Sequence, residues 1–346
     1  MTSFYQTKKE EFCYTEYAHL LKSYNLSFVK NFRYILRFHT LFHLSFFFLF
    51  CIELALFFST ALISIKSILT AVSLTSLTLS VFSYLILHHY LDIQKALKFK
   101  QLKTNFLMNS QKISSPHITE EHILSLNVTN AIHIAHFLEK PSIYILSIPP
   151  FEFFKHYAIT GQKILHHRAV MQMKEIILSI AFEKSFLLIQ EHPIKPSSHI
   201  SLIDTYLALA KTYQHALRLS NSLPLRKIRK KFTQQLQEKI IFAFEQTIEE
   251  LHILDRLFPQ EPWIHAKLAS CHHILGAIDK ELKEYEILSQ LCPKNKEVLL
   301  HLGILYFKMG ETASGLSTYQ TLRNIDAKYG CILLHHYTKP NKISVG

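Results

Sequence analysis

The chain reads LFHLSFFFLFCIELALFFSTALI over residues 41–63, SIKS over 64–67 and ILTAVSLTSLTLSVFSYLIL over 68–87. A helix that spans a bilayer needs about 20 consecutive, mainly apolar residues. Both long segments reach this length, and the second contains no charged residue. Because the connection between them is only four residues long, the two helices must turn back on each other. The sequence therefore predicts a transmembrane helical hairpin over residues 41–87.

Basic residues lie on both sides of this hairpin, whereas its turn carries only Lys66. They are Lys8, Lys9, Lys22, Lys30, Arg33 and Arg37 before it, and Lys95, Lys98, Lys100 and Lys103 after it. The positive-inside rule then places both ends in the cytoplasm. The net charge of +12 also suits an anionic membrane surface. We therefore expect an integral membrane protein whose residues 1–40 form a cytoplasmic segment; a buried hairpin of a soluble protein is the alternative.

Glu53 is the one acidic residue within the first apolar segment. A carboxylate near the bilayer centre costs roughly 2.5–3.5 kcal/mol, which the leucine, isoleucine and phenylalanine residues around it offset. If the hairpin folds about Ile65 and Lys66, Glu53 lies level with Thr78. We therefore expect a neutral carboxyl group that packs against the hydroxyl of Thr75 or Thr78 in a structural role. A proton or ion site is the functional alternative.

The rest of the chain has the pattern of successive amphipathic helices separated by proline-containing breaks. Glycine is scarce, with 7 residues in 346, which argues against the glycine-rich phosphate loops of nucleotide-binding α/β enzymes. One short run, Ser142 to Ile148, is rich in β-branched residues and is compatible with an extended strand. We expect an all-α protein in which residues 88–246 form a helical domain with no assigned function.

A period of 34 residues appears near the C-terminus. It relates Gly276 to Gly310, Leu268 to Leu302, Leu282 to Leu316, Tyr285 to Tyr319, Leu288 to Leu322, Leu291 to Ile325, and Pro259 to Pro293. Two helices that are joined at a glycine and repeat at this interval resemble the tetratricopeptide repeat (TPR). The resemblance implies an α-helical, TPR-like solenoid over residues 247–329, followed by a C-terminal tail over 330–346.

The resemblance is closest over residues 262–329. Where the family has Trp, Leu, Gly and Tyr in its first helix and a small residue and an aromatic in its second, this chain has Leu299, Leu302, Gly303, Tyr306, Gly315 and Tyr319. The preceding unit keeps Leu268, Ala269, Tyr285 and Pro293, but His265 and His272 replace its two aromatics. Upstream, residues 247–260 match only a second helix, so that unit is degenerate or a cap.

Members of this family bind a peptide or a partner helix in a concave groove lined by their first helices. The positions that this resemblance places in the groove are Trp263, Ala266, Ser270, His273, Glu297, Leu300, Ile304 and Phe307. The members that clamp a C-terminal carboxylate use Lys, Asn and Arg there, and this chain lacks them. Trp263 is the candidate anchor, since aromatic residues dominate binding hot spots. Packing of Trp263 between repeats is the alternative.

The basic run Arg226, Lys227, Arg229, Lys230 and Lys231 is a candidate patch for anionic lipid or an acidic partner. Such a run is more often a solvated helix start, which is the alternative, and nucleic acid is not expected because no aromatic residue is interleaved. Adjacent histidine pairs occur at four places, but no H-E-x-x-H motif accompanies them. No catalytic, metal or cofactor motif is recognisable, so the sequence predicts neither an enzyme nor a bound metal or cofactor.

Two functions remain open from the sequence. The first is a membrane-anchored scaffold that uses the TPR-like groove to bind a cytoplasmic protein or peptide. The second is a component of a membrane enzyme or of a transport or secretion assembly, with its chemistry in residues 95–246. The two-lobed hydrophobic hairpin is also similar to inclusion-membrane proteins of obligate intracellular bacteria. That resemblance implies secretion into a host-derived inclusion membrane as an alternative location.

Overall fold

The computed structural model describes the backbone over residues 2–63, 68–112, 120–138, 155–220 and 226–338. It describes side chains over 23–62, 68–108, 121, 123–138, 168–219 and 230–337. Within these ranges eleven α-helices occur and no strand, which confirms the all-α class. The run at 142–148 lies outside the described residues. The chain divides into two compact units, Met1–Lys184 and Ser185–Gly346.

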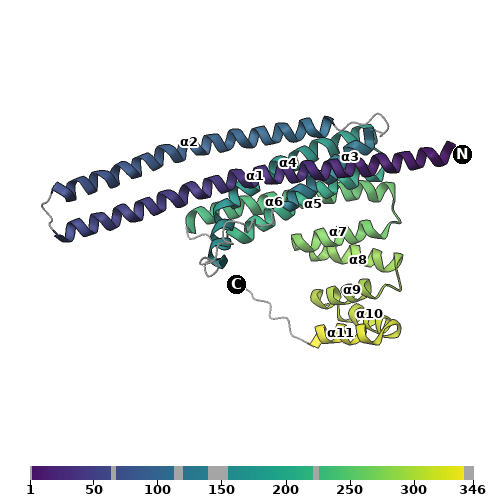
Figure 1. The fold of residues 1–346 in the computed structure, drawn as a ribbon. Coiled ribbons are helices and arrows are strands. Elements are labelled where there is room, and N and C mark those ends of the chain that lie inside the picture. The colour runs from purple at the N-terminus through teal and green to yellow at the C-terminus, as the bar shows by residue number, and fades with distance from the viewer. Residues whose placement is uncertain (1, 64–67, 113–119, 139–154, 221–225, 339–346) are drawn as a thin grey trace. The chain divides into compact units, whose positions relative to one another are not determined.

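The first unit begins with two long helices, α1 (Thr2–Ile63) and α2 (Ile68–Lys112), which lie side by side as an antiparallel hairpin (Figure 1). Both helices are longer than the predicted spans. Helix α1 runs without a break through residue 40, where a separate N-terminal segment was expected, and α2 continues past residue 88. The apolar segments are therefore one end of a longer rod.

Burial changes along this hairpin. At the end away from the turn, Phe28 packs against Phe106 with ring centroids 5.8 Å apart, and Phe32 packs against Phe99 at 5.4 Å. Over 41–62 and 68–87, by contrast, no side chain is buried. Monomeric soluble proteins rarely expose an apolar surface of this extent. By length and composition, the two helices could cross a membrane.

Two further helices complete the first unit: α3 (Glu120–Phe137) and most of α4 (Lys155–Glu191). Helix α3 buries Val128 and Ile134, and its Asn130 accepts a hydrogen bond from the side chain of Asn25 on α1. Helix α4 buries side chains at a helical interval, among them Met173, Ile177 and Ala181.

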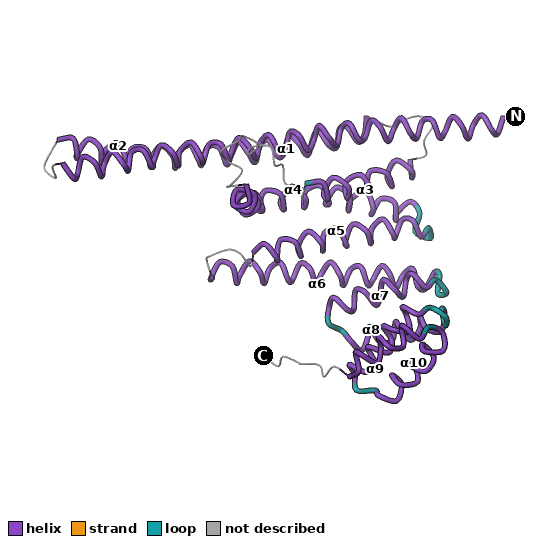
Figure 2. Tube along the Cα trace, turned by 60° about the horizontal axis from the view of Figure 1, so that its bottom comes forward, coloured by secondary structure: helices purple, strands orange, loops and turns teal. Residues whose placement is uncertain are grey.

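The second unit is a stack of helix pairs (Figure 2). Its helices after α4 are α5 (Pro196–Ser220), α6 (Arg226–Leu257), α7 (Pro262–Leu275), α8 (Ile278–Leu291), α9 (Lys296–Met309), α10 (Thr312–Ile325) and α11 (Ala327–Thr338). Leu251 and Leu254 of α6 pack with Ile264 and Leu268 of α7 in one core cluster. Helix α6 also extends well before residue 247, where the repeats were expected to begin.

Candidate functional site

Two glycines set the turns inside the repeats. Gly276 follows α7 with φ 72° and Gly310 follows α9 with φ 82°, so both occupy the left-handed region. A glycine adopts this conformation without the steric cost of a Cβ atom. At the first turn, the backbone N–H of Ala277 donates to the carbonyl oxygen of His272 at 3.0 Å. This left-handed ending satisfies carbonyl groups at the end of the helix and lets α8 return beside α7.

The residues that share the 34-residue period also share the core. Leu282 of α8 packs with Leu302 and Leu305 of α9, and Leu299, Leu322 and Leu333 from α9, α10 and α11 form the next cluster. A Cβ atom built at Gly303 would lie 2.5 Å from the Leu333 side chain, and one at Gly315 would lie 2.5 Å from the Phe307 ring. The small residues therefore allow the helices to approach closely.

None of the eight side chains expected in the groove is buried. Leu300, Ile304 and Phe307 are half-buried, and the others are exposed: Trp263, Ala266, Ser270, His273 and Glu297. Trp263 is 36% exposed, while the next residue, Ile264, is fully buried. Helix α7, the first helix of its repeat, thus has its core contacts and its candidate groove residues on different faces.

The candidate groove residues on α9 are partly covered by side chains of α10 and α11. Leu300, Ile304 and Phe307 pack against the cluster of α9, α10 and α11, and the Phe307 ring lies 4.7 Å from the Tyr337 ring of α11. Helix α11 covers residues 327–338, so part of the segment expected as a tail is a packed helix. The residues of α7 are therefore the more accessible half of the candidate groove.

The two histidines that replace family aromatics are both buried, and one of them lies between two acidic side chains. His265 Nδ1 lies 2.8 Å from Glu284 Oε2 on α8, and its Nε2 lies 3.3 Å from Asp255 Oδ1 on α6. Burial lowers the pKa of His272. In the next repeat, Tyr306 keeps the aromatic and its hydroxyl donates to Glu286 of α8 at 2.9 Å. At His265 the family's aromatic side chain is thus replaced by an imidazole that contacts carboxyl groups on the two neighbouring helices, α6 and α8.

His273, a candidate groove residue, also has an acidic neighbour. Its Nδ1 lies 3.0 Å from Oε1 of Glu281, a buried carboxyl group on α8. The sequence pattern does not distinguish Glu281, Glu284 and Glu286, because acidic residues on an amphipathic helix usually face solvent. The signal that could have identified them is the pair of histidines at positions where the family places aromatics.

Comparison with known proteins finds similarity only among solved structures. No protein-family model matches the chain, and no curated protein matches it in sequence. Similar solved structures include TTC0263, a thermophilic TPR protein of Thermus thermophilus, with 16% identity over 68% of this chain and 98% of that chain at a TM-score of 0.29. The TPR protein YrrB follows with 12% identity, 52% and 95% coverage and a TM-score of 0.26. The MamA RS-1 ArsTM double mutant is 12% identical over 49% of this chain and 97% of that chain, at a TM-score of 0.25.

The 34-residue period, the glycine turns and the shared core positions identify the repeats in this chain. The chain carries TPR-like repeats. The helix pairs α7–α8 and α9–α10 are the two repeats predicted over residues 262–329, and α11 packs on the last one.

The predicted intramembrane partner of Glu53 needs correction. Oε1 of Glu53 accepts hydrogen bonds from Ser80 at 2.6 Å and Ser76 at 3.2 Å. Thr75 and Thr78 instead donate to carbonyl oxygens of their own helix. The expected level along the hairpin was correct, but the helical face was wrong, because residues 76 and 80 are one turn apart and point to the same side.

The basic run lies where α6 begins, at Arg226. Lys230 and Lys231 are exposed, and the side chains of Arg226, Lys227 and Arg229 lie outside the described residues. A role for this patch stays a prediction.

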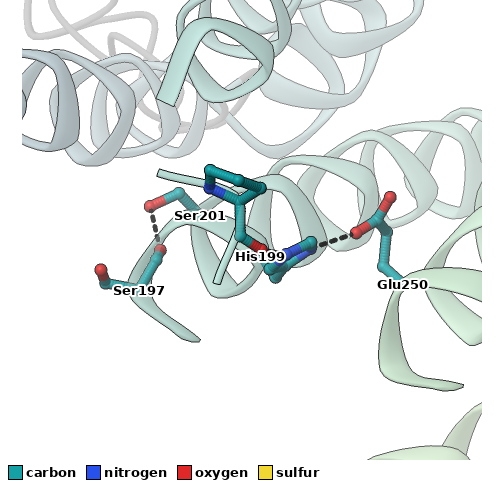
Figure 3. A network of polar contacts seen from close by, with 5 residues as sticks. Ser197, His199, Ser201 and Glu250 are labelled. Carbon is teal, nitrogen blue, oxygen red and sulfur yellow. Dashed lines mark hydrogen bonds and ion pairs between the residues drawn. The ribbon is translucent and has the colours of Figure 1, made fainter. Parts of the chain in front are cut away.

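His199 is a buried histidine that joins helices α5 and α6 (Figure 3). Its Nδ1 lies 2.8 Å from Glu250 Oε2, and its Nε2 lies 2.9 Å from the carbonyl oxygen of Pro193. The Nδ1 contact therefore joins α5 to α6, and the Nε2 contact joins α5 to the turn that precedes it. Among the side chains that the structure describes, no group of three or more potential metal ligands occurs.

Proposed function

We propose that this protein is a membrane-anchored interaction scaffold whose TPR-like repeats bind a cytoplasmic protein or peptide. The observation that carries this proposal is the separation of faces on α7. Ile264 and Leu268 are fully buried in the core, whereas Trp263, Ala266 and Ser270 remain at the surface. A large aromatic side chain that the core does not use is the type of residue that anchors interfaces.

The hairpin supports the anchoring half of the proposal. Burying an apolar surface stabilises a protein by about 25 cal/mol per Å², so an arm that leaves many phenylalanine and leucine side chains exposed favours an apolar environment. Membrane lipid provides one for both apolar segments. The excess of lysine and arginine at the open end of the hairpin supports a cytoplasmic location for both termini.

A photo-crosslinking experiment tests the groove in the full-length chain. A photoreactive phenylalanine analogue is placed at position 266 on α7 or at position 287 on α8. Ile287 on the second helix is the matched control, because its exposed fraction of 37% is close to the 36% of Trp263. We expect a discrete adduct from position 266 only, and we expect Trp263→Ala to reduce it while Ile287→Ala does not.

Unfolding measurements on the same variants separate recognition from packing. We expect Trp263→Ala and Ile287→Ala to leave the thermal unfolding midpoint similar, since both side chains are partly exposed. Equal crosslinking from positions 266 and 287 would contradict the groove. So would a large loss of stability in Trp263→Ala, because Trp263 would then belong to the core.

A further inference from the structure

A basic groove lies in the first unit between α2 and α4, beyond the apolar part of the hairpin. Its volume is about 890 Å³. Four cationic side chains line it: Lys95, Lys100, Lys103 and Arg168. Asp92 and Glu175 are the acidic residues in the lining, so the groove carries an excess of positive charge.

The four cationic groups are available for a ligand. None of them forms an ion pair with a carboxylate among the residues that the structure describes. Lys95 is half-buried, its Nζ lies 6.0 Å from the centroid of the Phe99 ring, and burial lowers the pKa of its amine. An anion in the groove would compensate this partly desolvated charge.

The groove also has an apolar part. Ala96, Phe99, Ala169 and Ile176 contribute to its lining, and Phe99 is buried in the packing of α1 against α2. A ligand that fits this surface has an anionic group next to apolar atoms. A phospholipid headgroup with its glycerol and upper acyl atoms has this combination, whereas a small free anion has only the first.

The position of the groove along α2 brings it close to the membrane surface. Lys95 follows Leu87 by eight residues, which is about 12 Å along a helix. Between them, Tyr90 and Ile93 are exposed, as is Leu97 just beyond. Tyrosine favours the membrane–water interface, and the exposed aliphatic side chains extend the apolar surface to the level of Lys95. Basic pockets at this depth suit anionic headgroups.

We propose that the groove between α2 and α4 binds the phosphate headgroup of an anionic phospholipid in the cytoplasmic leaflet. Lys95, Lys103 and Arg168 surround the phosphate, and Phe99 and Ile176 contact the apolar atoms next to it. This proposal requires the membrane insertion proposed above, because the lipid reaches the groove from the leaflet that surrounds the hairpin.

Lipid retention by the full-length chain tests the site. The protein is purified in detergent, incubated with equal amounts of phosphatidylglycerol and phosphatidylcholine, and examined by native mass spectrometry. Wild-type protein should retain phosphatidylglycerol in preference. The variant Lys95→Gln/Lys103→Gln should bind it roughly 25-fold more weakly, taking a factor of about five for each basic residue. The control Lys30→Gln/Lys98→Gln changes the charge equally at two exposed residues outside the groove.

Equal losses in both double variants would show non-specific charge attraction and would overturn the site. Displacement of the lipid by inorganic phosphate at comparable concentration, or by an acidic peptide, would assign the groove to a soluble anion instead. Alkaline extraction of membranes from the same cells distinguishes the two proposals. Protein that resists extraction but shows no headgroup preference contradicts only the lipid site, whereas protein released by alkali contradicts the membrane anchor.

Discussion

Replacing Gly303 with alanine tests how closely the last repeat packs against α11. Gly303 lies inside α9, where alanine would by itself favour the helix by about 0.5–1 kcal/mol over glycine. The new Cβ atom would lie 2.5 Å from Cδ2 and 2.9 Å from Cδ1 of Leu333. Ordinary carbon contacts are about 3.5–4.0 Å, so Leu333 would have to move by about 1 Å.

Leu333 has little room for this movement, because it is fully buried in the cluster with Leu299 and Leu322. Overpacking of this kind costs about 1–3 kcal/mol. After the gain in helix propensity is subtracted, we expect Gly303→Ala to destabilise α9–α11 by about 1 kcal/mol. Leu333→Ala alone should cost about 2–5 kcal/mol. The double variant should be less destabilised than the sum, because the clash disappears with the leucine side chain.

Hydrogen exchange measured by mass spectrometry on the full-length chain gives the local unfolding free energy of α9–α11 for each variant. Gly310→Ala is the matched control. It also adds a methyl group to a glycine, but at φ 82° and with no atom within 4 Å of the new Cβ. Its cost is backbone strain of about 1–2 kcal/mol, and it should add to that of Leu333→Ala. Additive energies for Gly303→Ala and Leu333→Ala would refute the close approach of these helices.

Three further predictions concern the core, the membrane segment and pH. Leu254→Ala should destabilise the fully buried α5–α7 core by about 2–5 kcal/mol in hydrogen exchange, whereas the exposed Leu257→Ala should change it by less than about 0.5 kcal/mol. Glu53→Leu should increase the fraction of chain that inserts into microsomes and leave partner crosslinking unchanged. A loss of partner crosslinking with normal insertion would instead indicate that Glu53 is an ion or proton site. Burial and the hydrogen bond to Glu286 raise the pKa of Tyr306 to about 12. The contribution of Tyr306 to stability should therefore be present below pH 10 and be lost as the pH rises towards 12. An alkaline ultraviolet titration in which Tyr306→Phe removes no transition near pH 12 would contradict this.

The repeats were predictable because their information is local and periodic. Gly276 and Gly310 mark turns that only a glycine makes at low cost, and the leucines at the same interval report the face that each helix buries. The level of Glu53 in the hairpin was also predictable from the turn. Its hydroxyl partners were not, because Ser76 and Thr78 differ by two residues and only the rotation of α2 decides which one faces α1.

Other features depend on packing that the sequence pattern does not encode. His265 bridges Asp255 and Glu284, two residues that lie on neighbouring helices and share no periodic position. The groove between α2 and α4 joins Lys95 to Arg168, more than 70 residues away. Helix α11 lacks a matching partner helix among the described residues, so no repeat signalled it. Each of these features follows from contacts between helices.

Cysteine labelling tests the membrane hairpin most directly. Cys51 in the first apolar segment and Cys331 on α11 are both exposed on the protein surface, whereas Cys271 is buried and its thiol has a pKa raised to about 11. In inside-out membrane vesicles, a membrane-impermeant maleimide should label Cys331 rapidly and should label Cys51 only after detergent is added. Labelling of Cys51 as fast as Cys331 without detergent would place the apolar segment in water and would contradict the account.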